Sequence, residues 1–234
     1  MRCDQREPGA IRPVALTDDF TKNALSSVLY RQGNTVVLCT VSLGERVPHH
    51  RLNTGKGWLT AEYAMLPSAT ARRKPRDIQR LKLDGRSAEI QRLIGRSLRA
   101  MLDFDRLGER LLVVDCDVLQ ADGGTRCASI SGASRALECA ARRLLERRIL
   151  SENPVVRRIG AVSVGLVRGE AMVDLCYEED LEAHVDLNLV MDEAAGIIEV
   201  QGTAEKGAYT RQQLNEMLDL GEAGIRQILE KTRM

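Results

Sequence analysis

Aromatic residues and histidine are scarce in this chain. Of its 234 residues, seven are aromatic and three are histidine. The histidines, His49, His50 and His184, share no zinc-site spacing with the six cysteines, and no Cys-x-x-Cys pair occurs, which argues against a zinc site. The cysteines are typical of reduced core residues, so we expect a cytoplasmic protein.

Long apolar runs are also absent. No apolar segment reaches the roughly 18 residues that a membrane span needs, and Met1 to Arg6 lack the apolar core of a signal peptide. We therefore expect no membrane partner. No linker rich in proline and serine and no shift in composition divides the sequence, so we expect a single domain over residues 1–234.

Charge is balanced overall but not locally. The formal net charge is +1, whereas the segment from Ala71 to Arg86 holds seven basic and two acidic residues, a local charge of +5. Because Pro75 and Gly85 argue against one continuous helix, we expect a loop that reaches outward and contacts phosphates. A solvated loop without a partner is the alternative. Nucleic-acid binding is favoured because such a segment repels itself unless a polyanion or counter-ions are present.

The stretch from Asp115 to Gly132 has the pattern of an anion-binding site. It begins in an apolar strand, breaks at Asp122-Gly123-Gly124, and continues into a helix of small residues that we expect to start near Ser129. The two glycines leave backbone N–H groups uncovered, and the helix start adds the positive end of its dipole.

Thr125 and Arg126 lie on this break and add a hydroxyl group and a guanidinium group. Phosphate is the favoured ligand for such a set of hydrogen-bond donors. A tight connection between strand and helix, in which Arg126 only pairs with a nearby carboxylate, fits the local pattern equally well.

Acidic residues gather farther along the chain, between Asp174 and Asp186. Asp180 and Asp186 are six residues apart, a spacing that scatters them around a helix. They converge only if a loop brings Asp180 back over the start of the strand that begins at Asp186. Such a pair binds a hard cation such as Mg²⁺ or transfers protons, and a charged surface loop is the alternative.

The order of predicted elements is mixed, with hairpins rather than regular βαβ alternation, which predicts the α+β class with mixed sheets and packed helices. The periodicities predict these elements: a hairpin from Ser26 to Val41 with a turn at Gln32-Gly33-Asn34, a helix from Ser87 to Met101, a strand from Leu111 to Leu119, a helix from Ser129 to Arg148, a strand from Ile159 to Val167 with a partner from Ala171 to Leu175, a strand from Asp186 to Met191, a strand from Ile197 to Val200, and a final helix with a capping box of Thr210 and Gln213.

Four blocks of sequence together carry a resemblance to a known family: Gly57 to Pro67, Glu89 to Ala100, Asp115 to Arg126, and Glu199 to Glu205. In these blocks, and in register from Arg12-Pro13 to the last helix, the chain closely resembles the bacterial ribonuclease PH family. Members of that family are phosphate-dependent 3′ exoribonucleases that trim transfer-RNA precursors. Several long blocks in register make the match far more specific than any one motif.

The resemblance implies a phosphorolytic reaction with inorganic phosphate as co-substrate, in which phosphate attacks the last phosphodiester of an RNA 3′ end and releases a nucleoside diphosphate. The reverse reaction adds nucleotides. It also implies a hexameric ring, a trimer of dimers. No side-chain nucleophile is needed, which agrees with the lack of a Gly-x-Ser-x-Gly motif and of a nucleotide P-loop.

The resemblance assigns roles to residues of this chain in three groups. Phosphate binding falls to Arg86, Gly124, Thr125 and Arg126. The catalytic or Mg²⁺-binding carboxylates are Asp180 and Asp186. RNA backbone contacts fall to Arg72, Arg73 and Arg76.

The chain departs from the family pattern at four positions. Ser68 stands in place of an arginine, Cys127 in place of a threonine, Cys176 in place of an acidic residue, and Lys206 in place of a glycine. The first removes one expected RNA contact, and the third changes the surroundings of the carboxylates. A catalytically silent RNA-binding ring subunit is the alternative function, and a hydrolytic metal nuclease is disfavoured because the anion site would then have no role.

Overall fold

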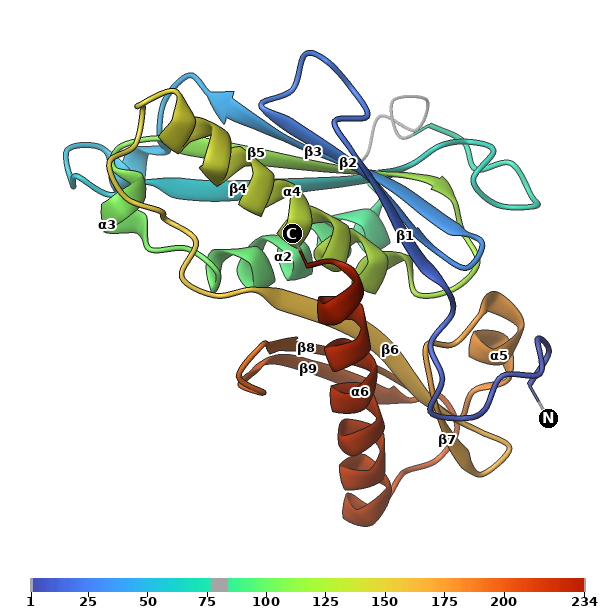
Figure 1. The fold of residues 1–234 in the computed structure, drawn as a ribbon. Coiled ribbons are helices and arrows are strands. Elements are labelled where there is room, and N and C mark those ends of the chain that lie inside the picture. Colours follow the sequence, from blue (N-terminus) through green and yellow to red (C-terminus); the bar gives the residue numbers. More distant parts are fainter. Residues whose placement is uncertain (1, 77–83, 234) are drawn as a thin grey trace.

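The computed structural model describes residues 2–76 and 84–233, in which two β-sheets and their helices form stacked layers (Figure 1). The larger sheet has the strand order β1-β2-β3-β5-β4 and the smaller one β7-β6-β8-β9. All pairings are antiparallel except the parallel pair β4–β5. The predicted α+β class with mixed sheets is confirmed.

The larger sheet and the helices beside it come from the first part of the chain. These elements are β1 (Val14–Asp18), β2 (Ser26–Gln32), β3 (Thr35–Gly44), the 3-10 helix His49–Arg51, β4 (Trp58–Met65), α2 (Gly85–Arg99), α3 (Phe104–Leu107), β5 (Leu111–Gln120) and α4 (Thr125–Glu146).

The smaller sheet and the remaining helices follow. These elements are β6 (Ile159–Val167), β7 (Glu170–Val173), α5 (Tyr177–Glu182), β8 (Val185–Asp192), β9 (Ile197–Ala204) and α6 (Arg211–Lys231).

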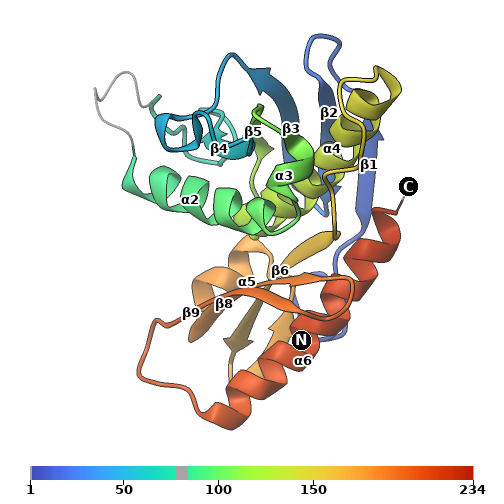
Figure 2. The same ribbon diagram turned by 90° about the vertical axis from the view of Figure 1, so that its left-hand side faces the viewer.

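Helices α2 and α4 lie between the two sheets, and α6 covers the other face of the smaller sheet (Figures 1 and 2). Strand β6 is buried along its whole length because α4 packs against one face of it and α6 against the other. By contrast β5 alternates between buried and half-exposed residues, since helices cover one of its faces. The core therefore consists of two main clusters, one under each sheet.

The small residues of α4 let it pack tightly between the sheets. A Cβ atom on Gly132 would lie 2.8 Å from the Cys39 Sγ and the Tyr30 Cβ, too close for any larger residue. On the opposite side, the Ser131 hydroxyl accepts a hydrogen bond from the Ala161 N–H at 3.0 Å and binds β6. The small residues of α4 therefore allow its close approach to both sheets.

Several boundaries differ from the predicted ones. Helix α4 begins at Thr125 rather than near Ser129, because Gly124 adopts a left-handed conformation (φ 63°) and serves directly as the N-cap. Strand β7 ends at Val173 because Asp174 also has a positive φ, of 56°. Strand β9 continues to Ala204 because it pairs with β8 as far as Val185.

The cysteines are all free, as predicted, and five of the six are buried. Cys3 is exposed, so the prediction of a core position is wrong for this residue. None of the helices in the described ranges combines the length and apolar character that crossing a bilayer requires.

Candidate active site at the start of helix α4

The turn between β5 and α4 is held in place from both sheets. Gly123 and Gly124 have φ values of 73° and 63°, and a Cβ atom on Gly123 would collide with the backbone at Leu175 and Cys176. Thr35 on β3 donates to the Gly123 carbonyl at 2.7 Å and accepts from the Asp122 N–H at 3.0 Å. The glycines are therefore required both for the turn and for the close approach of the second half of the chain.

Helix α4 starts at this turn without a side-chain cap. Its first N–H groups and its dipole are thus open to an anion. Thr125, in the first turn, shares a hydrogen bond of 2.9 Å with the Tyr63 hydroxyl of β4. Burial raises the pKa of Tyr63, while the hydrogen bond with Thr125 and the positive charges of Arg86 and Arg126 oppose the rise.

Arg126 is the second residue of α4 and points toward the smaller sheet. Its Nη1 donates to the Gln201 Oε1 of β9 at 3.2 Å, and its Nη2 lies 4.0 Å from the Asp186 Oδ2 of β8. Gln201 in turn donates to Glu89 of α2 at 2.8 Å. Because 4.0 Å is the outer limit of an ion pair, Arg126 is only loosely paired and keeps donors for a ligand.

The predicted loop position of Asp180 is wrong, because Asp180 is part of the short helix α5; Asp186 is the second residue of β8. Burial raises the pKa of Asp180, and the like charge of Asp186 raises it further. Burial also raises the pKa of Asp186. The positive charges of Arg126 and Arg86 oppose both shifts.

Asn188 and Cys127 fix the orientation of the Asp186 carboxylate. Asn188 Nδ2 lies 3.4 Å from each carboxylate oxygen, and the Cys127 thiol donates to the Asn188 Oδ1 at 3.2 Å. The departure from threonine at position 127 therefore keeps a donor to this amide. Glu205 is the last residue of the block from Glu199 to Glu205. Its negative charge raises the pKa of both Asp180 and Asp186.

A buried ion pair between Arg12 and Asp174 is not apparent from the sequence pattern. Arg12 donates to both Asp174 carboxylate oxygens, at 2.6 Å through Nη2 and 3.1 Å through Nε, and its backbone N–H adds a third bond of 2.6 Å. The same guanidinium donates to the carbonyl of Asp122. Asp122 in turn accepts from the Tyr177 N–H of α5 at 3.2 Å. These bonds link the glycine turn to the helix that carries Asp180.

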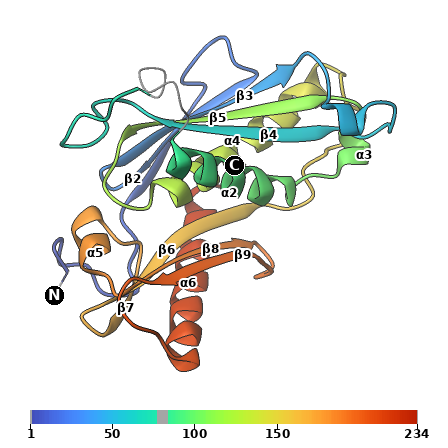
Figure 3. The ribbon, with the colours of Figure 1, turned by 180° about the vertical axis from the view of Figure 1, so that it is seen from behind.

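The predicted RNA-binding residues Arg72, Arg73 and Arg76 are exposed on the segment that follows β4. This segment projects from the same end of the molecule as α5 (Figures 1 and 3). Lys74 turns back and pairs with Asp84 at 2.9 Å. Residues 77–83 of the predicted basic loop lie outside the described residues.

Two family models match the chain. The model of the 3′ exoribonuclease family, domain 1, matches residues 10–142, and that of domain 2 of the same family matches residues 158–224. The chain belongs to the 3′ exoribonuclease family.

Curated relatives named ribonuclease PH are similar over nearly the whole chain. The protein from Nostoc sp. (strain PCC 7120 / SAG 25.82 / UTEX 2576) is 57% identical over 228 residues, which cover 97% of this chain and 92% of the relative. The protein from Synechococcus sp. (strain JA-3-3Ab) is 53% identical over 235 residues, which cover 99% of this chain and 96% of the relative. The predicted phosphorolytic 3′ exoribonuclease, with phosphate as co-substrate, is confirmed by these relatives.

Solved structures share the fold. An Archaeoglobus fulgidus exosome with RNA bound to its active site has a TM-score of 0.85 at 23% identity, covering 99% of this chain and 92% of that one. Rice (Oryza sativa) Rrp46 has a TM-score of 0.81 at 18% identity, covering 100% of this chain and 99% of that one. At these identities the likeness extends to the fold alone.

Proposed function

We propose that the charged cluster at the start of α4 is the phosphorolytic centre of this exoribonuclease. Arg86, Gly124, Thr125 and Arg126 bind inorganic phosphate, and Asp180 and Asp186 are the catalytic carboxylates across from it. The observation that carries the proposal is the approach of Arg126 to within 4.0 Å of Asp186 across the junction of the two sheets. Arg126 and Asp186 are thereby close together without being consumed in a tight ion pair.

The chemistry requires the neutralisation of like charges. An oxygen of inorganic phosphate attacks the phosphorus of the last phosphodiester, the bond from that phosphorus to the O3′ of the preceding nucleotide breaks, and a nucleoside diphosphate is released. Both reactants are anions, so Arg86, Arg126 and the open N–H groups of α4 lower the repulsion and orient the attacking oxygen. Tyr63 holds the Thr125 hydroxyl in position for the same anion.

We propose that Asp180 and Asp186 also hold Mg²⁺. Burial and mutual repulsion raise the pKa of Asp180, and a divalent cation would relieve this repulsion. The proposed ligands are two carboxylates, one on α5 and one on β8. That number fits Mg²⁺, which takes one or two carboxylates together with substrate phosphates. The bound ion would neutralise the negative charge of the phosphodiester that is attacked.

The exposed Arg72, Arg73 and Arg76 are proposed to contact the RNA backbone. Their guanidinium groups bind phosphates without reading bases, so affinity should fall as salt rises. The natural substrates are proposed to be the 3′ ends of transfer-RNA precursors. We further propose a hexameric ring, a trimer of dimers, in the cytoplasm. Light scattering of the purified protein would test the ring, since a mass other than six chains contradicts it.

The experiment that tests the function is an assay of RNA with a free 3′ hydroxyl in the presence and absence of phosphate, with products separated by chromatography. We expect shortening only with phosphate and nucleoside diphosphates as products. Nucleoside monophosphates formed without phosphate would contradict the proposal. The alternative of a silent ring subunit predicts no product in either case, and the presence of Arg86, Arg126, Asp180 and Asp186 argues against it.

A further inference from the structure

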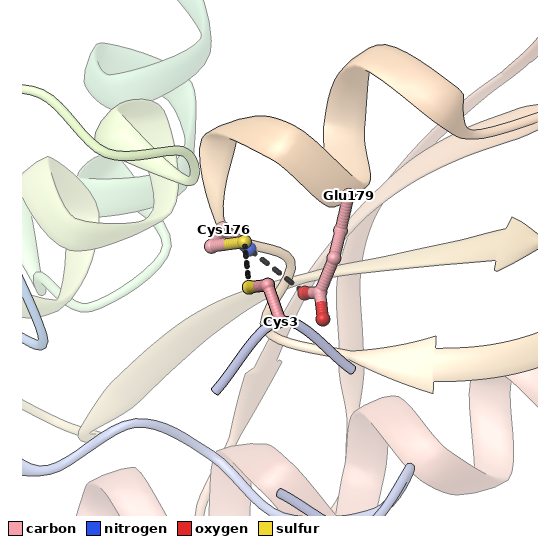
Figure 4. A group of neighbouring side chains, drawn as sticks. All are labelled: Cys3, Cys176 and Glu179. Carbon is pink, nitrogen blue, oxygen red and sulfur yellow. Dashed lines mark hydrogen bonds between the residues drawn. The ribbon is translucent and has the colours of Figure 1, made fainter. Parts of the chain in front are cut away.

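Two thiols from opposite ends of the chain lie in contact beside helix α5. Cys3 Sγ and Cys176 Sγ are 3.0 Å apart, although 173 positions separate them in sequence (Figure 4). Cys3 is exposed to solvent, whereas Cys176 is buried and caps the N-terminus of α5. Cys176 is also one of the departures from the family pattern, which has an acidic residue at this position.

The backbone around both sulfurs is held by a buried ion pair. Arg2, next to Cys3, donates to both Glu179 oxygens at 2.8 Å. Glu179 also accepts a hydrogen bond from the Cys176 N–H at 3.0 Å (Figure 4). Arg2 also donates to the Asp174 carbonyl at 2.9 Å. The N-terminal segment is therefore docked against α5 by contacts that do not involve the thiols, and these contacts keep the sulfurs together.

A metal ion could in principle use the same group, because Cys3, Cys176 and Glu179 offer three ligand atoms close together. The geometry argues against it. Two thiolates on a tetrahedral zinc ion lie about 3.8 Å apart, whereas these sulfurs are 3.0 Å apart. Both Glu179 oxygens already accept hydrogen bonds, and the adjacent Arg2 charge opposes a cation. The separation of the sulfurs lies between the roughly 2.05 Å of a disulfide and the zinc value, so the sulfurs are closer together than a shared zinc ion would hold them.

A small cavity gives access to this group from solvent. It has a volume of about 150 Å³ and is lined by Arg2, Cys3, Met172 and Glu179 among others. Burial and the Cys3 thiol raise the pKa of Cys176 to about 12. The exposed Cys3 is therefore the sulfur that meets an oxidant first.

We propose that Cys3 and Cys176 form an oxidisable dithiol that closes to an intramolecular disulfide by exchange with a small disulfide such as oxidised glutathione. The Cys3 thiolate attacks one sulfur of the oxidant, forming a mixed disulfide and releasing one glutathione thiolate. The Cys176 sulfur, after losing its proton, attacks the Cys3 sulfur and releases the second glutathione. Two protein thiols become one disulfide, and the oxidant is reduced to two thiols.

The disulfide would fasten the N-terminal segment to α5, four residues before Asp180. In a reducing compartment the pair stays open, and only an oxidising shift closes it. The proposal does not depend on the exoribonuclease function, because its test measures thiols rather than RNA turnover.

The chain contains a matched control pair. Cys39 and Cys116 are direct partners on β3 and β5, yet their exposed fractions are 0% and 1%, and both thiols bind the Ser129 carbonyl. A bulky disulfide cannot reach them in the folded protein. They should stay reduced under conditions in which Cys3 and Cys176 react.

The experiment treats the folded full-length protein with oxidised glutathione, blocks remaining thiols under denaturing conditions, and maps peptides without reduction. We expect free thiols to fall from the six of the sequence to four and the chain to become about 2 Da lighter, with one linked peptide pair holding Cys3 and Cys176. Cys176→Ser should instead retain a glutathione adduct on Cys3, and Cys3→Ser should retain all five of its thiols.

Three results would overturn the proposal. One is a stable glutathione adduct on Cys3 of the unsubstituted protein with Cys176 still free. Another is linkage between chains, or between Cys39 and Cys116, in place of the predicted bond. The third is binding of one zinc ion per chain, measured by dialysis with zinc alone, that protects both thiols from the oxidant and is lost in Cys3→Ser.

Discussion

Two neighbouring carboxylates in one turn of α5, Glu179 and Asp180, have opposite pKa shifts. Burial acts to raise the pKa of Glu179, but its hydrogen bonds and the charge of Arg2 outweigh burial and lower it. Burial raises the pKa of Asp180, and Asp186 adds to the rise. The same short helix thus carries one carboxylate whose charge the protein neutralises and one whose charge it leaves partly uncompensated.

The contrast extends to the networks on either side. Arg2 and Arg12 are buried and bind Glu179 and Asp174 at 2.6–2.8 Å. Arg126, by contrast, stays 4.0 Å from Asp186. The close ion pairs of Arg2 and Arg12 neutralise buried charges and hold the backbone in place. The loose pair of Arg126 with Asp186 leaves donors and acceptors for the proposed ligands, phosphate and RNA. Removing a charge from the first network should therefore cost stability, and removing one from the second should cost activity.

The largest effect is expected from Asp180→Asn. Because the ionised Asp180 is disfavoured by burial, a neutral side chain of the same shape should leave the free energy of unfolding within about 1 kcal/mol of the original. Phosphorolysis should fall by at least about 100-fold. The measurement pairs release of nucleoside diphosphate with a denaturation curve, and RNA binding at equilibrium serves as the control. If Asp180→Asn retains its phosphorolytic activity, the distinction between a structural Glu179 and a catalytic Asp180 is wrong.

Arg12→Ala should do the reverse, because it removes the nearer ion-pair partner of the buried Asp174, at 2.6 Å, and leaves Arg6 at 3.5 Å. We expect the free energy of unfolding to fall by about 3–5 kcal/mol, measured by denaturant titration. Replacing Asp174 by Ala in the same chain should recover part of the loss, since no unpaired charge is then buried. If the single variant is as stable as the original chain, the tie between Arg12 and Asp174 does not hold the structure.

A smaller effect is expected from replacing Arg72, Arg73 and Arg76 together by Ala. RNA affinity should fall, and the slope of affinity against salt should become flatter by about two to three units if all three bind phosphates. A control removes the same charge from exposed positions elsewhere, Arg106, Arg147 and Arg226. Equal slopes in the two triple variants would show that the segment after β4 is not the RNA contact.

Local features could be predicted from the sequence because neighbouring residues determine them. The turn at Gly33-Asn34 joins β2 and β3 as predicted, and Thr210 with Gln213 caps α6. Helix α4 begins four residues before the predicted start at Ser129, because the small residues after Arg126 indicate close packing and not the helix boundary. Thr125 and Arg126 therefore belong to the first turn of the helix.

The site was predictable in part. The glycine turn and Arg126 lie in the block from Asp115 to Arg126, whereas Asp180 and Asp186 lie outside all four blocks and were assigned by the resemblance as a whole. The buried ion pair between Arg12 and Asp174 could not be predicted. The two residues are 162 positions apart, and no sequence periodicity relates them. The same holds for the contact of Cys3 with Cys176, which arises only when the first residues dock on α5.

The prediction of one domain stays a prediction. The chain has two main hydrophobic clusters, and separate family models match its two parts. We propose that the parts fold as one unit, because β6 is covered by α4 on one face and by α6 on the other. A single denaturation transition seen alike by fluorescence of Trp58 and by circular dichroism would support this, and two separate transitions would contradict it.

The most direct test of the central claim is the phosphate KM of Arg126→Lys, measured at saturating RNA. Lysine keeps the positive charge but lacks the planar guanidinium group that can bind phosphate through two N–H donors. We therefore expect a KM for phosphate at least about 10-fold higher, with RNA affinity unchanged. Arg226→Lys, at an exposed pair on α6, is the control and should change neither value. An unchanged phosphate KM in Arg126→Lys would contradict the assignment of the attacking phosphate to the start of α4.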